Sequence, residues 1–189
     1  MRQSLTKLAA LMAVAGLFAA TAQAQAPNKL TIGFLTDMSS VYSDLDGKNG
    51  ALAVQMAIDD FGGKVNGMPI ELLTADNQNK ADVALSKARE WFDTQKMQML
   101  IGGTNSAAAL GLAKLAQDRK RIFFVNGSGS SALTNEQCSP YTVHYAWDSV
   151  AFAKGAAAAL TQQGSKDWFI LTADYAIGHA LEADAAKVV

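Results

Sequence analysis

Residues 97–109 read MQMLIGGTNSAAA, and the rest of the chain is best understood by working outward from them. Met97 to Ile101 form a short apolar run with the length of a buried strand. Two glycines follow and allow a tight bend, because glycine carries no Cβ. Thr104 to Ser106 are residue types that favour a helix N-cap, and Ala107 to Ala116 read as the helix. The stretch therefore predicts a strand that enters a helix through a loop of small residues.

The same order of elements recurs before and after this stretch. Apolar runs predict further strands at Leu30–Leu35, Ile70–Ala75 and Arg121–Val125. Apolar residues at helical spacing predict helices that begin near Gly47 and Ala81. Strands joined by single helices form a parallel sheet, because a parallel connection needs a crossover. The sequence thus predicts an α/β fold in which a parallel sheet is flanked by helices.

The loops that follow the predicted strands meet at one edge of this sheet. Right-handed crossovers place them at the carboxyl ends of the strands, where ligands bind in open α/β sheets. Two of the loops are rich in Gly, Ser and Asn, so that backbone amides and hydroxyls can approach a ligand closely. The alternative is that these polar residues only cap helices. The candidate ligand-binding residues in the two loops are Asn105, Ser106, Gly127, Ser128 and Gly129.

Further candidates lie at the same edge. Tyr42 follows the first strand and Trp147 lies in a later extended segment, where a closing cleft can stack either ring on a ligand. One of four loop carboxylates can pair with a ligand ammonium, and the sequence does not choose among Asp37, Asp44, Asp46 and Asp76. Ordinary solvated loop side chains are the alternative for all four.

The N-terminus has the pattern of a secretory signal. Arg2 and Lys7 precede an apolar run from Leu8 to Ala20, and the tripeptide AQA at 22–24 supplies a cleavage site. The run is shorter than the roughly 20 residues of a membrane-spanning helix. We expect residues 1–24 to be a cleaved signal peptide and the mature protein to be periplasmic. A net charge of −1 argues against a nucleic-acid partner.

The residues after the fourth predicted strand indicate a second lobe. Residues 141–147 are aromatic and extended, and a helical stripe, a strand at Trp168–Thr172 and a helix from Ile177 follow. We expect a first lobe at 25–140, an interlobe linker at 141–148 and the beginning of a second lobe at 149–189.

This second lobe has one complete strand, which cannot bury its own faces. We therefore expect the second lobe to be incomplete and the chain to be a fragment. Cys138 is the only cysteine, so we expect any disulfide partner to lie in the missing part.

Motifs for cofactors and catalysis are weak. Residues 127–132 fit G-x-G-x-x-A, but a polar segment that ends at Pro140 follows them in place of a long crossover helix. His144 and His179 are far apart and have no cysteine or carboxylate at metal-ligand spacing. No serine has evident histidine and acid support. We therefore expect no cofactor, no metal site, no catalytic residue and no enzymatic activity.

A series of short sequence motifs resembles those of the solute-binding proteins of ABC importers, in the leucine/isoleucine/valine-binding (type I periplasmic binding protein) family. The resemblance covers residues 29–189, about the first half of a family member, and depends on the order of these motifs. They are Ser39-Ser40, Asn49-Gly50-Ala51, Phe61-Gly62-Gly63, Gly67, Ile101-Gly102, Ser106, Leu133-Thr134, Tyr141, Asp174-Tyr175 and Gly178.

The resemblance implies a two-lobed protein that closes on a small amphipathic solute and delivers it to an ABC permease in the inner membrane. It implies that Ser106 contacts the ligand carboxylate, with Gly127 and Gly129 in the next loop. Ile177 stands where the family has an aromatic tyrosine, which puts leucine-like specificity in doubt and favours a different ligand such as an amide or an aromatic acid. We expect the full-length protein to be a monomer.

Two other function classes are left open by the sequence. A sensor of the same fold would pass ligand binding to a receptor or regulator instead of a transporter. A nucleotide-dependent enzyme would need the residues at 127–132 to bind a dinucleotide, in a context that lacks the expected helix.

Overall fold

The computed structural model describes residues 28–145 and 147–189, so the predicted signal peptide lies outside the described part of the chain. The first elements are β1 (Leu30–Thr36), α2 (Gly47–Asp60), β2 (Lys64–Val65), β3 (Met68–Asp76), α3 (Ala81–Thr94), β4 (Met99–Gly102), α4 (Ser106–Arg119) and β5 (Ile122–Val125). They are followed by the 3-10 turn η1 (Ser131–Leu133), β6 (Thr142–His144), α5 (Ser149–Phe152), the π-helix η2 (Ala153–Ala158), α6 (Ala159–Gln162) and α7 (Ala176–Ala186).

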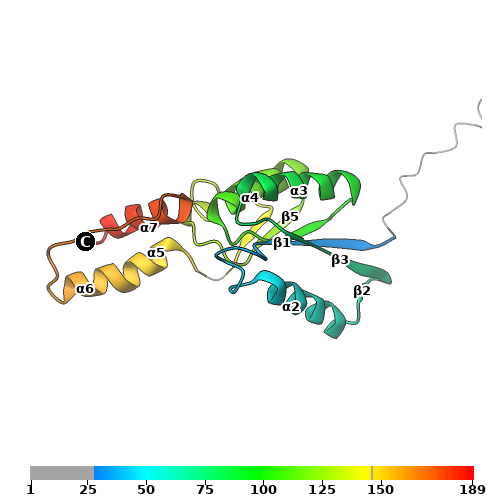
Figure 1. The fold of residues 1–189 in the computed structure, drawn as a ribbon, viewed down its shortest axis with the longest axis horizontal. Helices are drawn as coiled ribbons and strands as arrows, with labels where there is room; N and C mark the ends of the chain where they lie inside the picture. The colour runs from blue at the N-terminus through cyan, green and yellow to red at the C-terminus, as the bar shows by residue number, and fades with distance from the viewer. Residues whose placement is uncertain (1–27, 146) are drawn as a thin grey trace, which may run out of the picture.

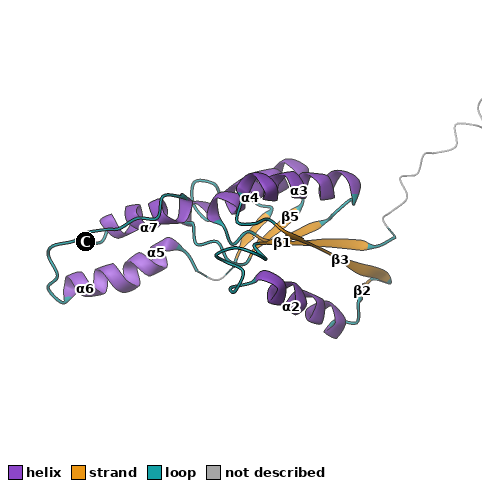
Figure 2. Ribbon diagram, viewed as in Figure 1, coloured by secondary structure: helices purple, strands orange, loops and turns teal. Residues whose placement is uncertain are grey.

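One sheet of six strands forms the centre of the fold, in the order β2-β3-β1-β4-β5-β6. All neighbours pair in parallel except β2, a two-residue strand that runs antiparallel to β3. Helices α3 and α4 cover one face of the sheet and α2 lies on the other (Figure 2). This arrangement confirms the predicted α/β fold with a parallel sheet flanked by helices.

The hydrophobic core lies between the sheet and the α3–α4 pair. Leu35 of β1, Leu100 of β4 and Phe123 of β5 are fully buried there, together with Leu112 of α4. Side chains alternate between the two faces of a strand, so these residues point to one side while their neighbours point to α2. The core fixes the carboxyl ends of β1, β4 and β5 side by side.

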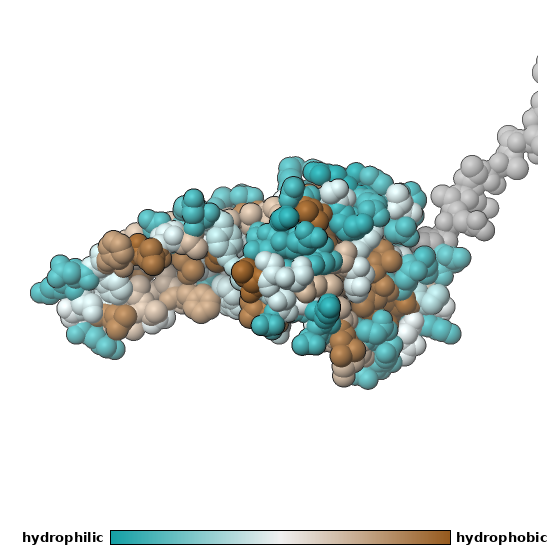
Figure 3. All heavy atoms as spheres, in the orientation of Figure 1, coloured by the Kyte–Doolittle hydropathy of each residue, from teal (hydrophilic) through white to brown (hydrophobic). Residues whose placement is uncertain are grey.

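Residues 149–189 form a segment that projects from the sheet, which we call the arm (Figure 1). Residues 149–162 make one continuous helical segment, and α7 runs beside it. Hydrophobic surface is visible on this arm (Figure 3), and Phe169 and Leu171 are each 90% exposed. Within residues 28–145 and 147–189, every helix is too short or too polar to cross a membrane.

The strand predicted at Trp168–Thr172 is wrong, because residues 165–173 form neither helix nor strand and pair with no strand in the described part of the chain. A strand needs a neighbour to satisfy its N–H and C=O groups, and apolar composition alone supplies none. Thr142–His144, inside the predicted linker, forms β6 and pairs with β5. The division of the chain into two lobes stays a prediction.

Candidate functional site

The chain order of the sheet creates a switch point between β1 and β4. From β1 the chain crosses to β3 on one side through α2, and from β3 it returns to β4 on the other side through α3. Ligands of open α/β sheets bind at such a point, outside the carboxyl ends of the strands. The residues that follow Thr36 and Gly102 therefore flank the position where a ligand is expected.

Gly102 ends β4 at this point and has a φ of +135°, a value that L side chains rarely adopt. A Cβ at Gly102 would overlap with the carbonyl oxygen of Leu35 in β1. The predicted bend therefore depends on glycine both for its dihedral angle and for its close approach to the neighbouring strand.

Helix α4 begins directly after this bend. The side chain of Asn105 accepts a hydrogen bond from the N–H of Ala108 at 2.9 Å, which is an N-cap, and its amide donates to Asn79 Oδ1 at 2.6 Å. Ser106 is 1% exposed, whereas Ala107 next to it is exposed. The first N–H groups of a helix have no acceptor within it, and the helix dipole favours an anion there. Asn105 is thus occupied as a cap, and the reachable start of α4 lies at Ala107.

Ser106 and Ser128 lie together, as their neighbouring strands predict. The Ser128 hydroxyl donates to Ser106 Oγ at 3.0 Å, and both side chains are buried. The carbonyl oxygen of Ser128 lies 2.7 Å from His144 Nε2 of β6. A Cβ at Gly127 would lie 2.9 Å from Thr104 Oγ1. The two candidate loops are therefore packed against each other, and contact of their hydroxyls with a solute stays a prediction.

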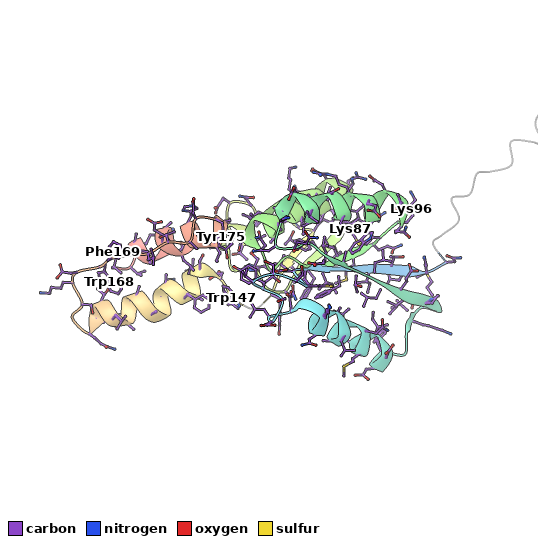
Figure 4. All side chains as sticks on the ribbon, in the orientation of Figure 1. Lys87, Lys96, Trp147, Trp168, Phe169 and Tyr175 are labelled. Carbon is purple, nitrogen blue, oxygen red and sulfur yellow. The ribbon has the colours of Figure 1, made fainter. Side chains whose placement is uncertain are left out.

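Gly129 lies under an aromatic ring, because a Cβ at Gly129 would overlap with the Trp147 side chain. Trp147 contacts Phe152 edge to face, with ring centroids 4.7 Å apart, and Figure 4 shows it where the arm joins the sheet. The Ser149 N–H donates to the carbonyl oxygen of Gly129 at 2.7 Å. The second candidate loop is therefore connected directly to the first helix of the arm.

Tyr42 and Ile177 line one cavity of about 550 Å³ at the base of the arm. Apolar side chains dominate its wall, including Phe152, Ile170 and Leu181. Burial raises the pKa of the Tyr42 hydroxyl and the nearby Asp37 carboxylate raises it further, so this hydroxyl is neutral at physiological pH. The structure brings Tyr42 and Ile177 together with each other, and Phe152 links their cavity to Trp147.

Three of the four loop carboxylates make internal hydrogen bonds. Asp37 accepts from the N–H groups of Ser40 and Tyr42 at 2.8 and 2.9 Å. Asp76 accepts from the Met38 N–H and the Ser39 hydroxyl at 2.9 and 2.5 Å. Burial tends to raise the pKa of Asp76, but these bonds, one from the Gln78 N–H and the nearby Lys48 leave it below its ordinary value.

Asp46 is the third of these carboxylates. It accepts hydrogen bonds from the hydroxyls of Thr36 and Thr104 at 2.6 and 2.5 Å and from the Asn126 amide at 3.3 Å. Asp44 is exposed. Asp46 and His144 belong to the candidate site but were not distinguished by the sequence, because their hydrogen-bond partners are distant in the chain.

Asp184 of α7 is buried where the arm meets the segment after β5, with 5% of its surface exposed. Its carboxylate accepts from the hydroxyls of Ser131 and Ser149 at 2.9 and 2.7 Å and from Lys187 Nζ at 2.8 Å. Burial raises the pKa of this carboxyl, but the bonds from Lys187, Ser149 and Ser131 outweigh it and leave the pKa below its ordinary value of 3.8. Asp184 is thus ionised at neutral pH.

We expect Asp184→Asn to lower the free energy of unfolding by about 1–3 kcal/mol at neutral pH, because charge-assisted hydrogen bonds are lost. A carboxyl whose pKa is lowered by folding stabilises the protein above its unfolded pKa, and this contribution disappears as the pH falls through the folded value. The difference between parent and variant should therefore shrink below pH 3.8. Urea unfolding across pH measures it, with exposed Asp167→Asn as the control. A difference that does not vary with pH would contradict the assignment.

Metal-ligating groups do not gather in the described residues: no three His, Cys, Asp or Glu side chains lie close enough to bind a metal ion. The Gly127–Ala132 segment enters the short turn η1 instead of a long helix. The arrangement at the sheet edge offers hydroxyls, amides and a helix N-terminus, which suit a small acceptor such as a carboxylate.

Comparisons with known proteins agree with the fold. A family model described as periplasmic binding protein matches residues 29–189. A periplasmic binding protein from Burkholderia mallei has 55% sequence identity and a TM-score of 0.83, over 86% of this chain and 44% of that chain. A branched-chain amino acid ABC transporter periplasmic ligand-binding protein from Burkholderia xenovorans has 38% identity and a TM-score of 0.73, over 85% and 43%.

A third structure is an ABC transporter solute-binding protein from Rhodopseudomonas palustris in complex with 4-hydroxybenzoate, with 26% identity, a TM-score of 0.74 and coverage of 85% and 43%. The chain thus spans less than half the length of these structures. None of the curated proteins compared with it matches in sequence. The family that the sequence predicts is confirmed: the chain belongs to the periplasmic binding protein family and has its type I α/β fold.

Proposed function

We propose that this chain is part of the solute-binding component of an ABC importer and that it binds a small amphipathic solute between two lobes. The proposal is supported by family membership and by similarity to the B. xenovorans ligand-binding protein of a branched-chain amino acid ABC transporter. The proposed partners are the solute and an ABC permease in the inner membrane. The protein is proposed to act in the periplasm, as a monomer, without catalysing a reaction.

The observation that carries the proposal is the convergence of the two candidate loops, which follow β4 and β5, beside the switch point. Ser106 and Ser128 come from different βα loops, yet their hydroxyl oxygens are 3.0 Å apart beside the N-terminus of α4. A carboxylate can accept hydrogen bonds from such a cluster and from the first amides of the helix. Because both hydroxyls are buried, binding of a solute to them requires the two loops to separate slightly or to exchange their mutual bond for one to the solute.

The apolar half of the solute is proposed to contact the cavity that Tyr42 and Ile177 line. That cavity of about 550 Å³ has the size of a small-molecule pocket. The neutral Tyr42 hydroxyl can donate to a polar substituent. Branched-chain amino acids, their amides and aromatic acids all combine a polar end with an apolar body, and the R. palustris neighbour contains 4-hydroxybenzoate.

A thermal-shift screen of the complete encoded protein tests the function. The probes are L-leucine, L-leucinamide, benzoate and 4-hydroxybenzoate, with glucose as a solute that has no acidic or amide group. We expect one class of probe to raise the melting temperature, because a ligand that binds only the folded state stabilises it. A melting temperature that none of the four probes shifts would refute the proposed solute class.

We expect Ser106→Ala to weaken binding of the solute found in that screen by about 1–3 kcal/mol, through the loss of one buried hydrogen bond. Calorimetric titration measures the affinity. Ser165→Ala, which changes an exposed serine between α6 and α7, is the matched control. An unchanged affinity in Ser106→Ala would remove Ser106 from the site.

A further inference from the structure

Asp46 occupies the N-cap position of α2 but does not cap that helix. An aspartate at this position ordinarily accepts a hydrogen bond from the N–H of the second or third helical residue. The Asp46 side chain makes no such bond, although it is the residue directly before Gly47. Its carboxylate is turned away from its own helix and toward the ends of the strands.

The carboxylate of Asp46 instead joins three strand ends. Thr36 is the last residue of β1, Thr104 follows β4 and Asn126 follows β5. The Thr36 hydroxyl donates to one carboxylate oxygen, and the Thr104 hydroxyl and the Asn126 amide donate to the other. The oxygens of Thr36 and Thr104 are also 3.3 Å apart. One side chain therefore spans the switch point and both candidate loops.

The other two carboxylates that make hydrogen bonds at this edge, Asp37 and Asp76, connect fewer parts of the chain. Asp37 accepts only from N–H groups within its own loop, and Asp76 accepts from the loop after β1 and from the residues that follow β3. Within the described residues, no ion pair joins Asp46 to a basic side chain. A partly buried charge without a cation depends on its hydrogen-bond donors, so Asp46 holds Thr36, Thr104 and Asn126 in place.

Thr104 carries this restraint into the second loop. Its side chain lies between the Asp46 carboxylate and Gly127, where a Cβ would come within 2.9 Å of Thr104 Oγ1. Ser106 is two residues beyond Thr104, and Ser128 is one residue beyond Gly127. A shift of Thr104 would therefore move both loops that bring the two serine hydroxyls together.

We infer that Asp46 is a positioning residue: through Thr104 and Asn126 it sets how residues 102–106 and 126–130 lie relative to each other. The inference rests on the proposed function for its effect on solute binding. Its structural part, the ordering of the two loops, does not need a solute.

Amide hydrogen exchange of the complete encoded protein, without added solute, tests the structural part. We expect Asp46→Ala to raise the exchange rates of residues 102–106 and 126–130 at least tenfold and to leave those of α3 unchanged. Asp44→Ala is the matched control, since it removes the same charge from an exposed position of the same loop. Unchanged exchange in both loops of Asp46→Ala would overturn the inference.

A pair of variants at Thr104 separates the hydroxyl from the packing against Gly127. Thr104→Val keeps the branched shape but cannot donate to Asp46, and Thr104→Ser keeps the hydroxyl. We expect faster loop exchange in Thr104→Val and near-parent exchange in Thr104→Ser. If Asp46→Ala fails to fold, this pair decides the question. Loss of folding in both Asp46→Ala and Thr104→Val would assign Asp46 to overall stability and overturn the positioning role.

Titration with L-leucine and 4-hydroxybenzoate tests the binding part. If the parent binds either probe, we expect Asp46→Ala to bind it at least tenfold more weakly. Asp60→Ala, which removes an exposed carboxylate from the C-terminal end of α2, is the control for this measurement and should bind the probe like the parent. Equal affinity in Asp46→Ala would overturn the inference and leave the proposed function intact. If the parent binds neither probe while the loops of Asp46→Ala exchange faster, the proposed solute class fails and the ordering role of Asp46 stands.

Discussion

Gly102→Ala should lower the free energy of unfolding by roughly 2–5 kcal/mol, because two costs combine at this residue. Gly102 has a φ of +135°, a conformation that a residue with a Cβ rarely adopts. The added Cβ would also overlap with the Leu35 carbonyl oxygen, which belongs to the backbone of β1 and cannot rotate away. Relief of this overlap requires β4 to move away from β1. Urea unfolding of parent and variant measures the loss.

Gly62→Ala is the matched control for this prediction. Gly62 has a φ of +90°, and an added Cβ there would meet nothing within 4 Å. It should therefore lose only the conformational part, about 1–3 kcal/mol. The excess loss in Gly102→Ala measures the contact between β1 and β4 at the switch point. Equal losses in the two variants would show that β4 does not approach β1 this closely.

The bend at Gly102 also shows what could be predicted from the sequence. An apolar run, two glycines and three N-cap residues give strand, turn and helix from local chemistry alone, and β4 and α4 form as expected. The parallel sheet followed from the alternation of such units. Residues 165–173 show the limit of that reasoning, because composition predicts an extended backbone but a strand exists only if another strand pairs with it.

Part of the candidate site could also be predicted from the order of strands and loops in the sequence. Ser106 and Ser128 were expected near each other because their loops follow two strands at one edge, and their hydroxyls bond to each other. The contacts of Asp46 and His144 could not be predicted from the sequence. Asp46 bonds to Thr104, 58 residues away, and a solvated aspartate or a helix cap has the same sequence pattern. His144 reaches Ser128 because Thr142–His144 joins the sheet as β6, in a segment expected to be a linker.

The burial of Ser106 and Ser128 adds a requirement that the sequence did not suggest. A solute that uses these hydroxyls must compete with their mutual bond and with the packing of Trp147 over Gly129. Trp147 in turn contacts Phe152 of the arm. The loop that contains Ser128 is therefore packed directly against the arm, and the proposed hinge closure of two lobes around a ligand would act on this loop.

Phe123→Ala should be the most damaging single truncation near this site, with a loss of about 3–5 kcal/mol in the free energy of unfolding. Phe123 of β5 is fully buried, and its ring lies under the loop between β4 and α4, where a Cβ at Gly103 would come within 2.8 Å of it. Removal of the ring leaves a cavity because the surrounding strands and α4 relax only in part. The loop between β4 and α4, which leads to Ser106, would lose its packing contact with the Phe123 ring.

Phe169→Ala removes the same ring from a position that is 90% exposed and should change the free energy of unfolding by no more than about 0.5 kcal/mol. Chemical unfolding of both variants gives the comparison, and solute affinity measured at a temperature where Phe123→Ala stays folded gives a second one. We expect that affinity to fall as well, since the cavity lies beneath the candidate site. A loss below 1 kcal/mol in Phe123→Ala would mean that the core does not pack against the site loop. The support of Ser106 would then have to come from Asp46 and the Ser128 loop alone.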